Sequence, residues 1–179
     1  MARPDNRQIT LKPQDLLVAL KLVARKGRKY SYAELSDELG LSASEVHACV
    51  KRAEVARLIS ATRGEETIPN SAALQEFLLH GAKYAFPATF GPVTRGIVTG
   101  YAAPPLSSHI AQSNELPPVW PDSEGPNRGV ALNPLYPTVA FAVRKDPVLY
   151  ELMALFDALR AGAVRERELA ATLLRERLV

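Results

Sequence analysis

The stretch LSASEVHACVKR, which follows Gly40, places hydrogen-bonding side chains at helical intervals. Short serine hydroxyls come first, and longer imidazole, ammonium and guanidinium donors come later. Short side chains at the start of a helix let it approach a surface closely, and the longer donors then reach the base edges and phosphates of duplex DNA. Ser44, His47 and Lys51 are expected at base edges, and Arg52 at a phosphate. The full set of expected contacts on this helix is Ser42, Ser44, His47, Lys51 and Arg52.

Two short helices joined by a tight turn are expected to position these side chains. Ser31 and Glu34 frame a capping box, in which a hydroxyl and a carboxylate satisfy free amides at the start of a helix. Ser42 and Glu45 frame a second capping box, and Gly40 between the two supplies the backbone freedom that a sharp turn needs. A short helix, a tight turn and a second helix make a helix-turn-helix. The apolar residues expected beneath it are Leu35, Leu39, Val46, Cys49, Val50 and Ala53.

A helix before this pair and two strands after it complete the unit. The first helix is expected to start near Pro13 and to end before Gly27. Residues 58–60 and 66–68 are predicted to form two short strands with a turn between them. A two-stranded ribbon directly after a recognition helix is the wing of a winged helix. Arg63, at the tip of this wing, is expected to reach a phosphate or the minor groove.

Residues 32–53 resemble the helix-turn-helix of bacterial winged-helix repressors such as the MarR-like group. The residues that carry the resemblance, at core and turn positions, are Leu35, Leu39, Gly40, Leu41, Val46 and Cys49. With the preceding helix and the strand pair, the resemblance covers residues 12–69. It implies a winged-helix fold that binds duplex DNA through the helix at residues 42–53. The alternative is a winged helix that binds only proteins.

Charge is distributed unevenly along the chain. Residues 1–63 carry 12 Lys and Arg and 7 Asp and Glu, a net +5, whereas residues 64–179 carry 10 and 12, a net −2. The basic surplus therefore lies with the candidate DNA-reading segment, where it would neutralise phosphates. No apolar run approaches the roughly 20 residues needed to span a bilayer, and the N-terminus lacks the apolar stretch of a secretory signal. A cytoplasmic location without a membrane partner is expected.

Sequence motifs typical of enzymes or metal sites are absent. There is no phosphate-binding glycine-rich loop, no Gly-x-Ser-x-Gly and no His-Glu-x-x-His. His80 and His109 are isolated, and no cluster of Cys, His, Asp and Glu has metal-ligand spacing. Cys49 is the single cysteine and lies on the apolar face of its helix, which predicts an inert core thiol. We therefore expect no enzymatic activity, no cofactor and no metal.

The middle of the chain, residues 86–147, differs in composition from the rest. It holds 11 of the 14 prolines, and each proline lacks an amide donor, so long helices and central strands are not expected. Its aromatic residues are too numerous for a solvated spacer. We expect an ordered, extended segment in which only GIVTGYA and GVALN have strand character. Two interpretations stay open: a packed loop, or a surface that binds a partner protein.

Helices are predicted on both sides of this segment. One begins at Asn70 or Ser71 and ends near Gly81. A second begins at Pro147 and ends at Gly162, and the last covers VRERELAATLLRERL. The apolar sides of the last two helices either close a core or pair with a second copy of the chain.

These features predict a mainly α-helical fold with a small β-wing. Residues 1–69 would form the winged helix-turn-helix, and residues 70–179 would form a helical and extended region for dimerisation or partner binding. The predicted function is a transcriptional regulator, a repressor, that binds double-stranded DNA as a homodimer. The alternative is an antitoxin or adaptor whose residues 86–179 bind a partner protein, with or without regulation of its own operon through DNA.

Overall fold

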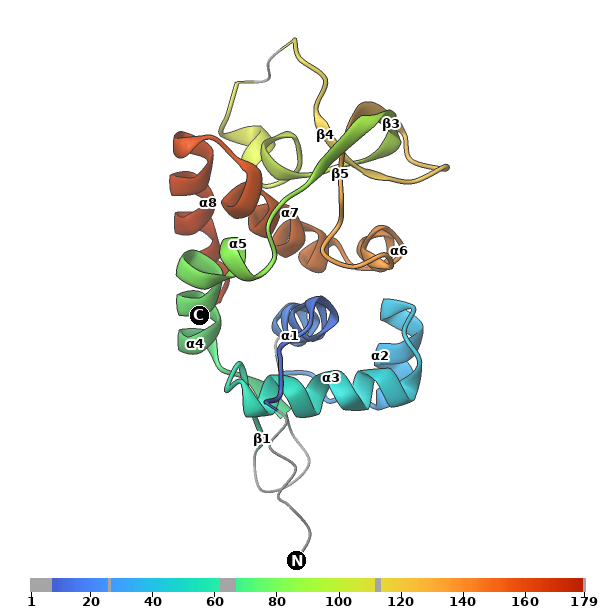
Figure 1. The fold of residues 1–179 in the computed structure, drawn as a ribbon, viewed down its shortest axis with the longest axis vertical. Coiled ribbons are helices and arrows are strands. Elements are labelled where there is room, and N and C mark those ends of the chain that lie inside the picture. Colours follow the sequence, from blue (N-terminus) through green and yellow to red (C-terminus); the bar gives the residue numbers. More distant parts are fainter. Residues whose placement is uncertain (1–7, 26, 62–66, 112–113, 179) are drawn as a thin grey trace, which may run out of the picture.

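The computed structural model describes residues 8–25, 27–61, 67–111 and 114–178. This part of the chain is mainly α-helical and contains two small sheets, so the predicted fold class is confirmed. Helix α1 (Pro13–Ala24) lies in the middle, with α3 (Ala43–Val55) on one side of it and α7 (Pro147–Ala161) on the other (Figure 1). None of the described helices has the length and apolar character that crossing a bilayer requires.

The helix-turn-helix consists of α2 (Tyr32–Leu39) and α3, joined through Gly40. The first predicted capping box is present at the start of α2. Ser31 Oγ accepts from the Glu34 N–H at 3.1 Å, and Glu34 Oε2 accepts from the Ser31 N–H at 2.8 Å. Gly40 ends α2 in the left-handed conformation, with φ of 65°. A glycine adopts this conformation without a Cβ clash, which explains the sharp turn.

The second capping box, predicted at the start of α3, is only half formed. Ser42 Oγ accepts from the Glu45 N–H at 3.2 Å, as predicted. The Glu45 carboxylate instead accepts from Tyr136 Oη at 3.0 Å and from Gln14 Nε2 at 3.3 Å. Both donors lie far from Glu45 in the sequence, so this carboxylate ties the start of α3 to the rest of the molecule.

The predicted strand pair follows α3. Strands β1 (Ile59–Ala61) and β2 (Thr67–Pro69) pair antiparallel, each beginning one residue later than predicted. The turn predicted between them, which includes Arg63, lies outside the described residues. The described part of the wing is therefore its base, where the strands leave and rejoin the helical core.

The helix after the wing is longer than predicted and contains an irregular turn. Helix α4 (Ser71–Glu76) continues through a π-helical turn at Phe77–Gly81 into α5 (Ala82–Ala85). A Cβ at Gly81 would lie 3.1 Å from the ring of Phe77. A larger residue at this position would require the Phe77 ring to shift slightly, and Gly81 does not end the helix as predicted.

Strands β3 (Phe90–Val98), β4 (Pro118–Pro121) and β5 (Asn127–Leu132) form a small closed sheet in which each strand pairs with both others. The predicted strand piece GVALN lies in β5 except for its last residue, but only the first three residues of GIVTGYA lie in β3, because Gly100–Ala102 form a 3-10 helical turn instead. Strand β4 was not predicted because prolines occupy both of its ends. A proline lacks an amide donor, yet its carbonyl still accepts: the Thr99 N–H donates to the Pro118 carbonyl at 2.9 Å.

Two glycines let these strands approach closely. A Cβ at Gly96 would lie 2.0 Å from the carbonyl oxygen of Trp120, and a Cβ at Gly129 would lie 2.1 Å from the carbonyl oxygen of Pro117. Backbone atoms cannot yield as a flexible side chain can. The closed sheet therefore depends on glycine at both positions.

A short helix, α6 (Val139–Lys145), lies inside the segment that was predicted to be extended. Pro137 and Pro147 limit its length, and this proline spacing masked it in the sequence. Helix α7 follows directly, and α8 (Val164–Arg177) packs against α7. The apolar side of α8 is used within the chain, where it buries Ala170, Leu173 and Leu174.

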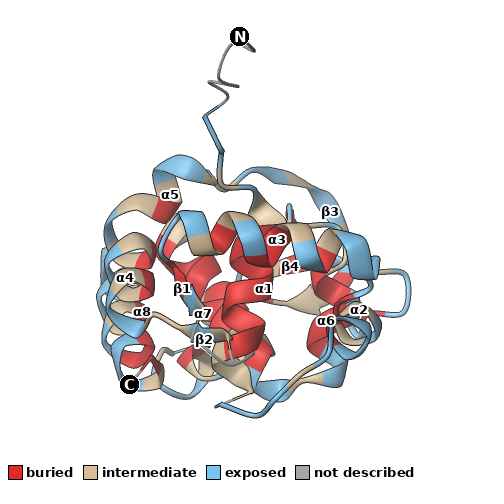
Figure 2. Cartoon of the chain, turned by 90° about the horizontal axis from the view of Figure 1, so that it is seen from below, coloured by how far each residue is buried: buried red, intermediate tan, exposed pale blue. Residues whose placement is uncertain are grey.

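Helix α1 is buried on nearly all sides and belongs to both halves of the molecule. Residues 15–22 are all buried, as Figure 2 shows for α1, and their apolar side chains join one cluster with those of α3 and α7. Lys21 is 4% exposed, with Nζ 2.6 Å from Asp146 at the start of α7 and 2.8 Å from Glu38 of α2. The boundary predicted at residue 69 therefore separates two segments that share this core.

Candidate nucleic-acid interface

Helix α3 lies along one end of the molecule, with β1 at its C-terminal end (Figure 1). One side of the helix is buried against the core by Val46, Cys49, Val50 and Ala53. The other side is exposed, which Figure 2 shows as the pale stretches of α3. Four of the predicted contact residues lie on this exposed side, which we name the recognition face: Ser42, Ser44, His47 and Lys51.

The start of α3 carries only short side chains. Ser42 Oγ and Ser44 Oγ lie 3.1 Å apart, and Ala43 between them is exposed. Backbone N–H groups in the first turn of a helix point toward the N-terminus, and the helix dipole favours negative charge there. A phosphate or a base edge could therefore approach this end of α3 without displacing a bulky side chain.

His47 contacts an aromatic residue of α2. The rings of His47 and Tyr32 lie 5.2 Å apart in an edge-to-face arrangement at 82°. The contact orients the imidazole of His47. Both side chains stay exposed, and Tyr32, which is 37% exposed, lies beside the recognition face. Tyr32 was not among the predicted site residues. Its approach to His47 follows from the angle between α2 and α3, which no local sequence signal specifies.

Lys51 is the most accessible cation of the recognition face. Its side chain is 60% exposed, and Nζ lies 3.0 Å from Glu54 Oε2 on the same helix. The hydrogen bond from Lys51 to Glu54 raises the pKa of the ammonium group. Lys51 therefore stays protonated at neutral pH. An exposed pair of this kind is weak because water screens it, so the ammonium group can exchange Glu54 for a phosphate.

Arg52, predicted to contact a phosphate, is engaged elsewhere. Its Nη2 lies 2.6 Å from Asp15 Oδ1 and its Nε lies 2.8 Å from Asp15 Oδ2, and the Asp15 side chain is fully buried. The hydrogen bond with Asp15 raises the pKa of the Arg52 guanidinium. This geometry gives Arg52 the role of joining α3 to α1. The phosphate contact stays a prediction that no contact in the structure supports.

Further cations lie beside the base of the wing. Arg28 and Lys29, in the turn before α2, line a shallow pocket of about 120 Å³ together with Thr67 and Ile68 of β2. The basic surplus of the N-terminal segment is therefore carried in part by this turn, which we did not place at the site from the sequence. Arg63, predicted at the wing tip, lies outside the described residues.

Among the residues that the structure describes, no group of three or more His, Cys, Asp and Glu side chains is arranged to hold a metal ion. Cys49 is fully buried on the inner side of α3, and burial raises the pKa of its thiol to about 12. What the recognition face offers is therefore hydroxyl, imidazole and ammonium donors on a rigid helix. These groups can form hydrogen bonds and neutralise charge.

Comparison with known families assigns the N-terminal part of the chain. Residues 19–59 match a family model described as winged helix-turn-helix DNA-binding, from the middle of α1 to the first residue of β1. Neither curated proteins nor solved structures give a significant match. The matched residues contain the whole recognition face. Residues 19–59 are accordingly similar to a winged helix-turn-helix DNA-binding domain, which confirms the resemblance predicted from the sequence for this part of the chain.

Proposed function

We propose that the protein is a transcriptional regulator that binds a specific sequence of duplex DNA and represses transcription. Helix α3 would be the recognition helix. The observation that carries the proposal is the division of α3 into a fully packed side and an exposed side with Ser44, His47 and Lys51. A helix held rigidly by one face and carrying donors on the other is what major-groove reading requires.

The residues of the recognition face would have different roles. Ser44 and His47 lie in the first turns of α3, which enter the major groove most deeply in helix-turn-helix proteins, so they would contact base edges. Lys51 lies one turn further along and would contact a phosphate or a base acceptor. Tyr32, at the start of α2, would donate its hydroxyl to the backbone on the rim of the groove. Arg52 would contribute indirectly, by holding α3 in place through Asp15.

We further propose that the protein acts as a homodimer. Helix-turn-helix dimers contact two half-sites about 34–36 Å apart, so a palindromic operator mirrors the two-fold symmetry of the protein. Sedimentation with and without operator duplex measures this directly. One chain per half-site is the expected stoichiometry.

A gel-shift assay with the DNA upstream of the protein's own gene tests the function. The wild-type chain is expected to shift this duplex at moderate salt in preference to an unrelated one. Lys51→Ala should weaken binding to all sequences and reduce the salt slope by about 1, whereas His47→Ala should relax discrimination at one base pair by about 1–3 kcal/mol.

The matched control is Arg175→Ala, which removes an exposed positive charge from α8 instead of from α3. It should leave the shift unchanged, because Arg175 lies outside the recognition face. Wild-type protein that fails to bind duplex at moderate salt would contradict the proposal. If a second protein also co-purified through residues 86–179, the adaptor alternative would be favoured instead.

A further inference from the structure

Strands β3 and β5 pair antiparallel, and one face of the resulting ribbon changes character along its length. Alternate residues of a strand share a face, and the bulge between Phe90 and Val93 keeps these two residues on the same face. This face, which we name the ribbon face, carries three cross-strand pairs: Phe90 with Leu132, Val93 with Val130, and Arg95 with Arg128. Figure 1 shows the ribbon at the end of the molecule opposite α3, so the ribbon face is separate from the recognition face.

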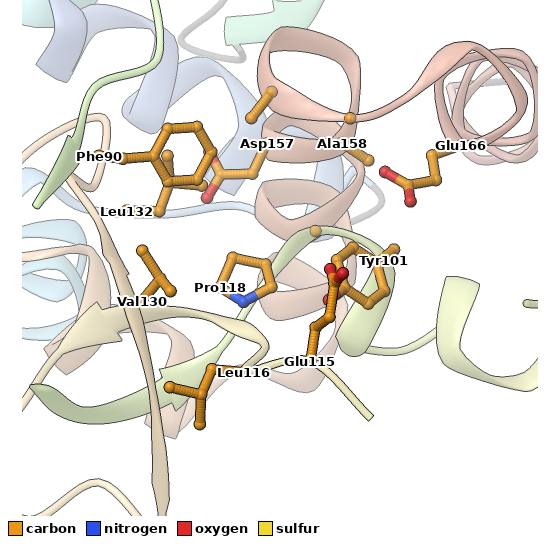
Figure 3. A pocket seen from close by; sticks show the side chains of 13 residues that line it. Phe90, Tyr101, Glu115, Leu116, Pro118, Val130, Leu132, Asp157, Ala158 and Glu166 are labelled. Atoms are coloured by element: carbon orange, nitrogen blue, oxygen red, sulfur yellow. The ribbon is translucent and has the colours of Figure 1, made fainter. Parts of the chain in front are cut away.

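The first two pairs make one end of the ribbon face apolar. Phe90 is 57% exposed and Val93 is 44% exposed. A pocket of about 220 Å³ opens beside them, between the closed sheet and the helices α7 and α8, and Figure 3 shows Phe90, Val130 and Leu132 together on one side of it. Leu116, which also lines the pocket, is 47% exposed. Large apolar side chains that stay exposed around a pocket are typical of an interaction site.

The third pair places two arginines directly opposite each other. Like charges in this arrangement destabilise a strand pair, and both Arg95 and Arg128 are exposed. Neither guanidinium group has a hydrogen bond or an ion pair with any residue that the structure describes. The acids in the turn after β4 are bound elsewhere, because Asp122 and Glu124 pair with Arg144 of α6 at 2.6 and 2.9 Å. The arginine pair therefore lacks an acidic partner within the described part of the chain.

We propose that the ribbon face binds an acidic segment of a second protein, which places one bulky apolar side chain in the pocket and its carboxylates on Arg95 and Arg128. Burial of the apolar side chain would supply most of the binding free energy. Each guanidinium group can bind a carboxylate through two parallel hydrogen bonds. None of the described residues that line the pocket is Lys, Arg or His, so the carboxylates would lie at the arginine end.

The size of the pocket and the surface around it favour a protein segment over other occupants. The pocket is smaller than the roughly 300–1,000 Å³ of typical small-molecule sites, so it fits a single side chain better than a separate ligand. A duplex on the recognition face would lie at the other end of the molecule, and a phosphate backbone offers no apolar group to Phe90 and Val93.

A second copy of this chain is also a poor occupant. In a two-fold interface the same surface of both copies meets. If that interface were centred on the ribbon face, Arg95 and Arg128 of one copy would face the same arginines of the other. A different protein with an acidic segment avoids this repulsion.

Selection from a phage library of random peptides, with the full-length protein as bait, tests the proposal. DNA is absent from the selection, so a failure here is distinct from a failure of DNA binding. The pocket pair and the arginine pair are separated by about four residues of extended chain. We expect enrichment of peptides in which a large apolar residue lies at about this distance from acidic residues. Selection that enriches no peptide, or only peptides without acidic residues, would overturn the proposal.

Variants place the peptide on the ribbon face. The most enriched peptide is measured by fluorescence anisotropy, and Arg95→Gln with Arg128→Gln should weaken its binding about tenfold. The matched control, Arg165→Gln with Arg175→Gln, removes two exposed arginines of α8 and should leave binding unchanged. Phe90→Ser, at a largely exposed position, should also weaken the peptide. Unchanged binding in the ribbon-face variants, each shown to be folded by circular dichroism, would contradict the assignment.

The double arginine variant also tests the other occupants. Its gel shift with duplex DNA and its sedimentation should both match those of the wild-type chain. Weaker binding of duplex would assign the arginines to a phosphate backbone, and altered self-association would assign the ribbon face to a second copy. Either result would overturn the proposal.

Discussion

At the scale of single residues, two neighbouring cations on α3 have opposite roles. Arg52 forms a bidentate contact with the fully buried Asp15, whereas Lys51 forms one exposed contact with Glu54. Removing one partner of a buried pair leaves an uncompensated charge in the core, but removing one partner of an exposed pair leaves a charge in water. Substitution of Arg52 should therefore mainly lower the stability of the fold, whereas substitution of Lys51 should mainly weaken DNA binding.

Arg52→Ala is expected to lower the free energy of unfolding by about 3 kcal/mol, because it leaves the Asp15 carboxylate buried and unpaired. Lys51→Ala should leave the free energy of unfolding nearly unchanged, because the Lys51 side chain is exposed to water. Urea denaturation followed by circular dichroism measures both values. Equal losses in the two variants would contradict the structural role of Arg52.

Cys49 should be chemically inert in the folded protein. Its side chain is fully buried, and burial raises the pKa of the thiol to about 12, so almost no thiolate exists at pH 8. An aromatic disulfide reagent such as Ellman's reagent is expected to react with Cys49 only after denaturation. Rapid modification of the native protein at pH 8 would disprove the core position inferred for this thiol.

At the scale of elements, Asp146 connects the helix-turn-helix to the second half of the chain. Its Oδ1 caps α7, accepting from the N–H groups of Val148 and Leu149, and its Oδ2 binds Lys21 of α1. Burial by itself would raise the pKa of Asp146, but the Lys21 hydrogen bond and the two backbone donors outweigh it and lower the pKa below the usual 3.8. The ionised form is therefore favoured by folding.

The lowered pKa of Asp146 predicts a pH dependence of stability. A carboxyl group whose pKa is lower in the folded state stabilises the protein above its unfolded pKa, and this contribution is lost as pH falls through the folded pKa. Asp146→Asn keeps the cap acceptor and should lower the free energy of unfolding at pH 7 by about 2 kcal/mol. Urea titrations at a series of pH values should show this difference shrinking below the usual pKa of 3.8. A difference that is constant with pH would contradict the assigned ion pair.

The elements that could be predicted from sequence are those with local signals. The capping box at Ser31 and the left-handed turn at Gly40 define the helix-turn-helix within a few residues of chain. Strand β4 could not be predicted, because its pairing partners lie in β3 and β5 and its own residues are bounded by prolines.

The candidate site, like the fold, could be predicted from the sequence only where local signals specify it. Helical periodicity was enough to place Ser44, His47 and Lys51 on one exposed side of α3. It could not reveal that Arg52 faces Asp15, because periodicity along α3 carries no information on how α1 crosses it. The same absence of inter-helix information hid the contact between Tyr32 and His47.

At the scale of the whole molecule, the winged helix-turn-helix shares its core with the remainder of the chain. The apolar side chains of α1 join a single cluster with those of α7, and Lys21 of α1 bonds to Asp146. Figure 1 shows α1 lying between α3 and α7. A fragment that ends before α4 would leave one side of α1 exposed to water.

Residues 1–69 expressed alone are therefore expected not to fold cooperatively. The loss of the α7 contact exposes several leucine-sized side chains, each worth about 1.5–3 kcal/mol on burial, which is comparable to the whole stability of a small domain. Thermal unfolding of the fragment, followed by circular dichroism, measures this, with the full-length chain as control. A sharp transition at a similar temperature would show that the first 69 residues are an independent domain.

The central claim, that the recognition face reads DNA sequence, is tested most directly by selection from a library of duplexes with a randomised centre. Full-length protein is mixed with the library at about 0.15 M salt, and the bound duplexes are sequenced. We predict that the wild-type chain enriches one motif and that Ser44→Ala with His47→Ala changes the preferred bases within it. Selection that enriches no motif, or that returns the same motif for the double variant, would contradict the assignment of α3 as the reading helix.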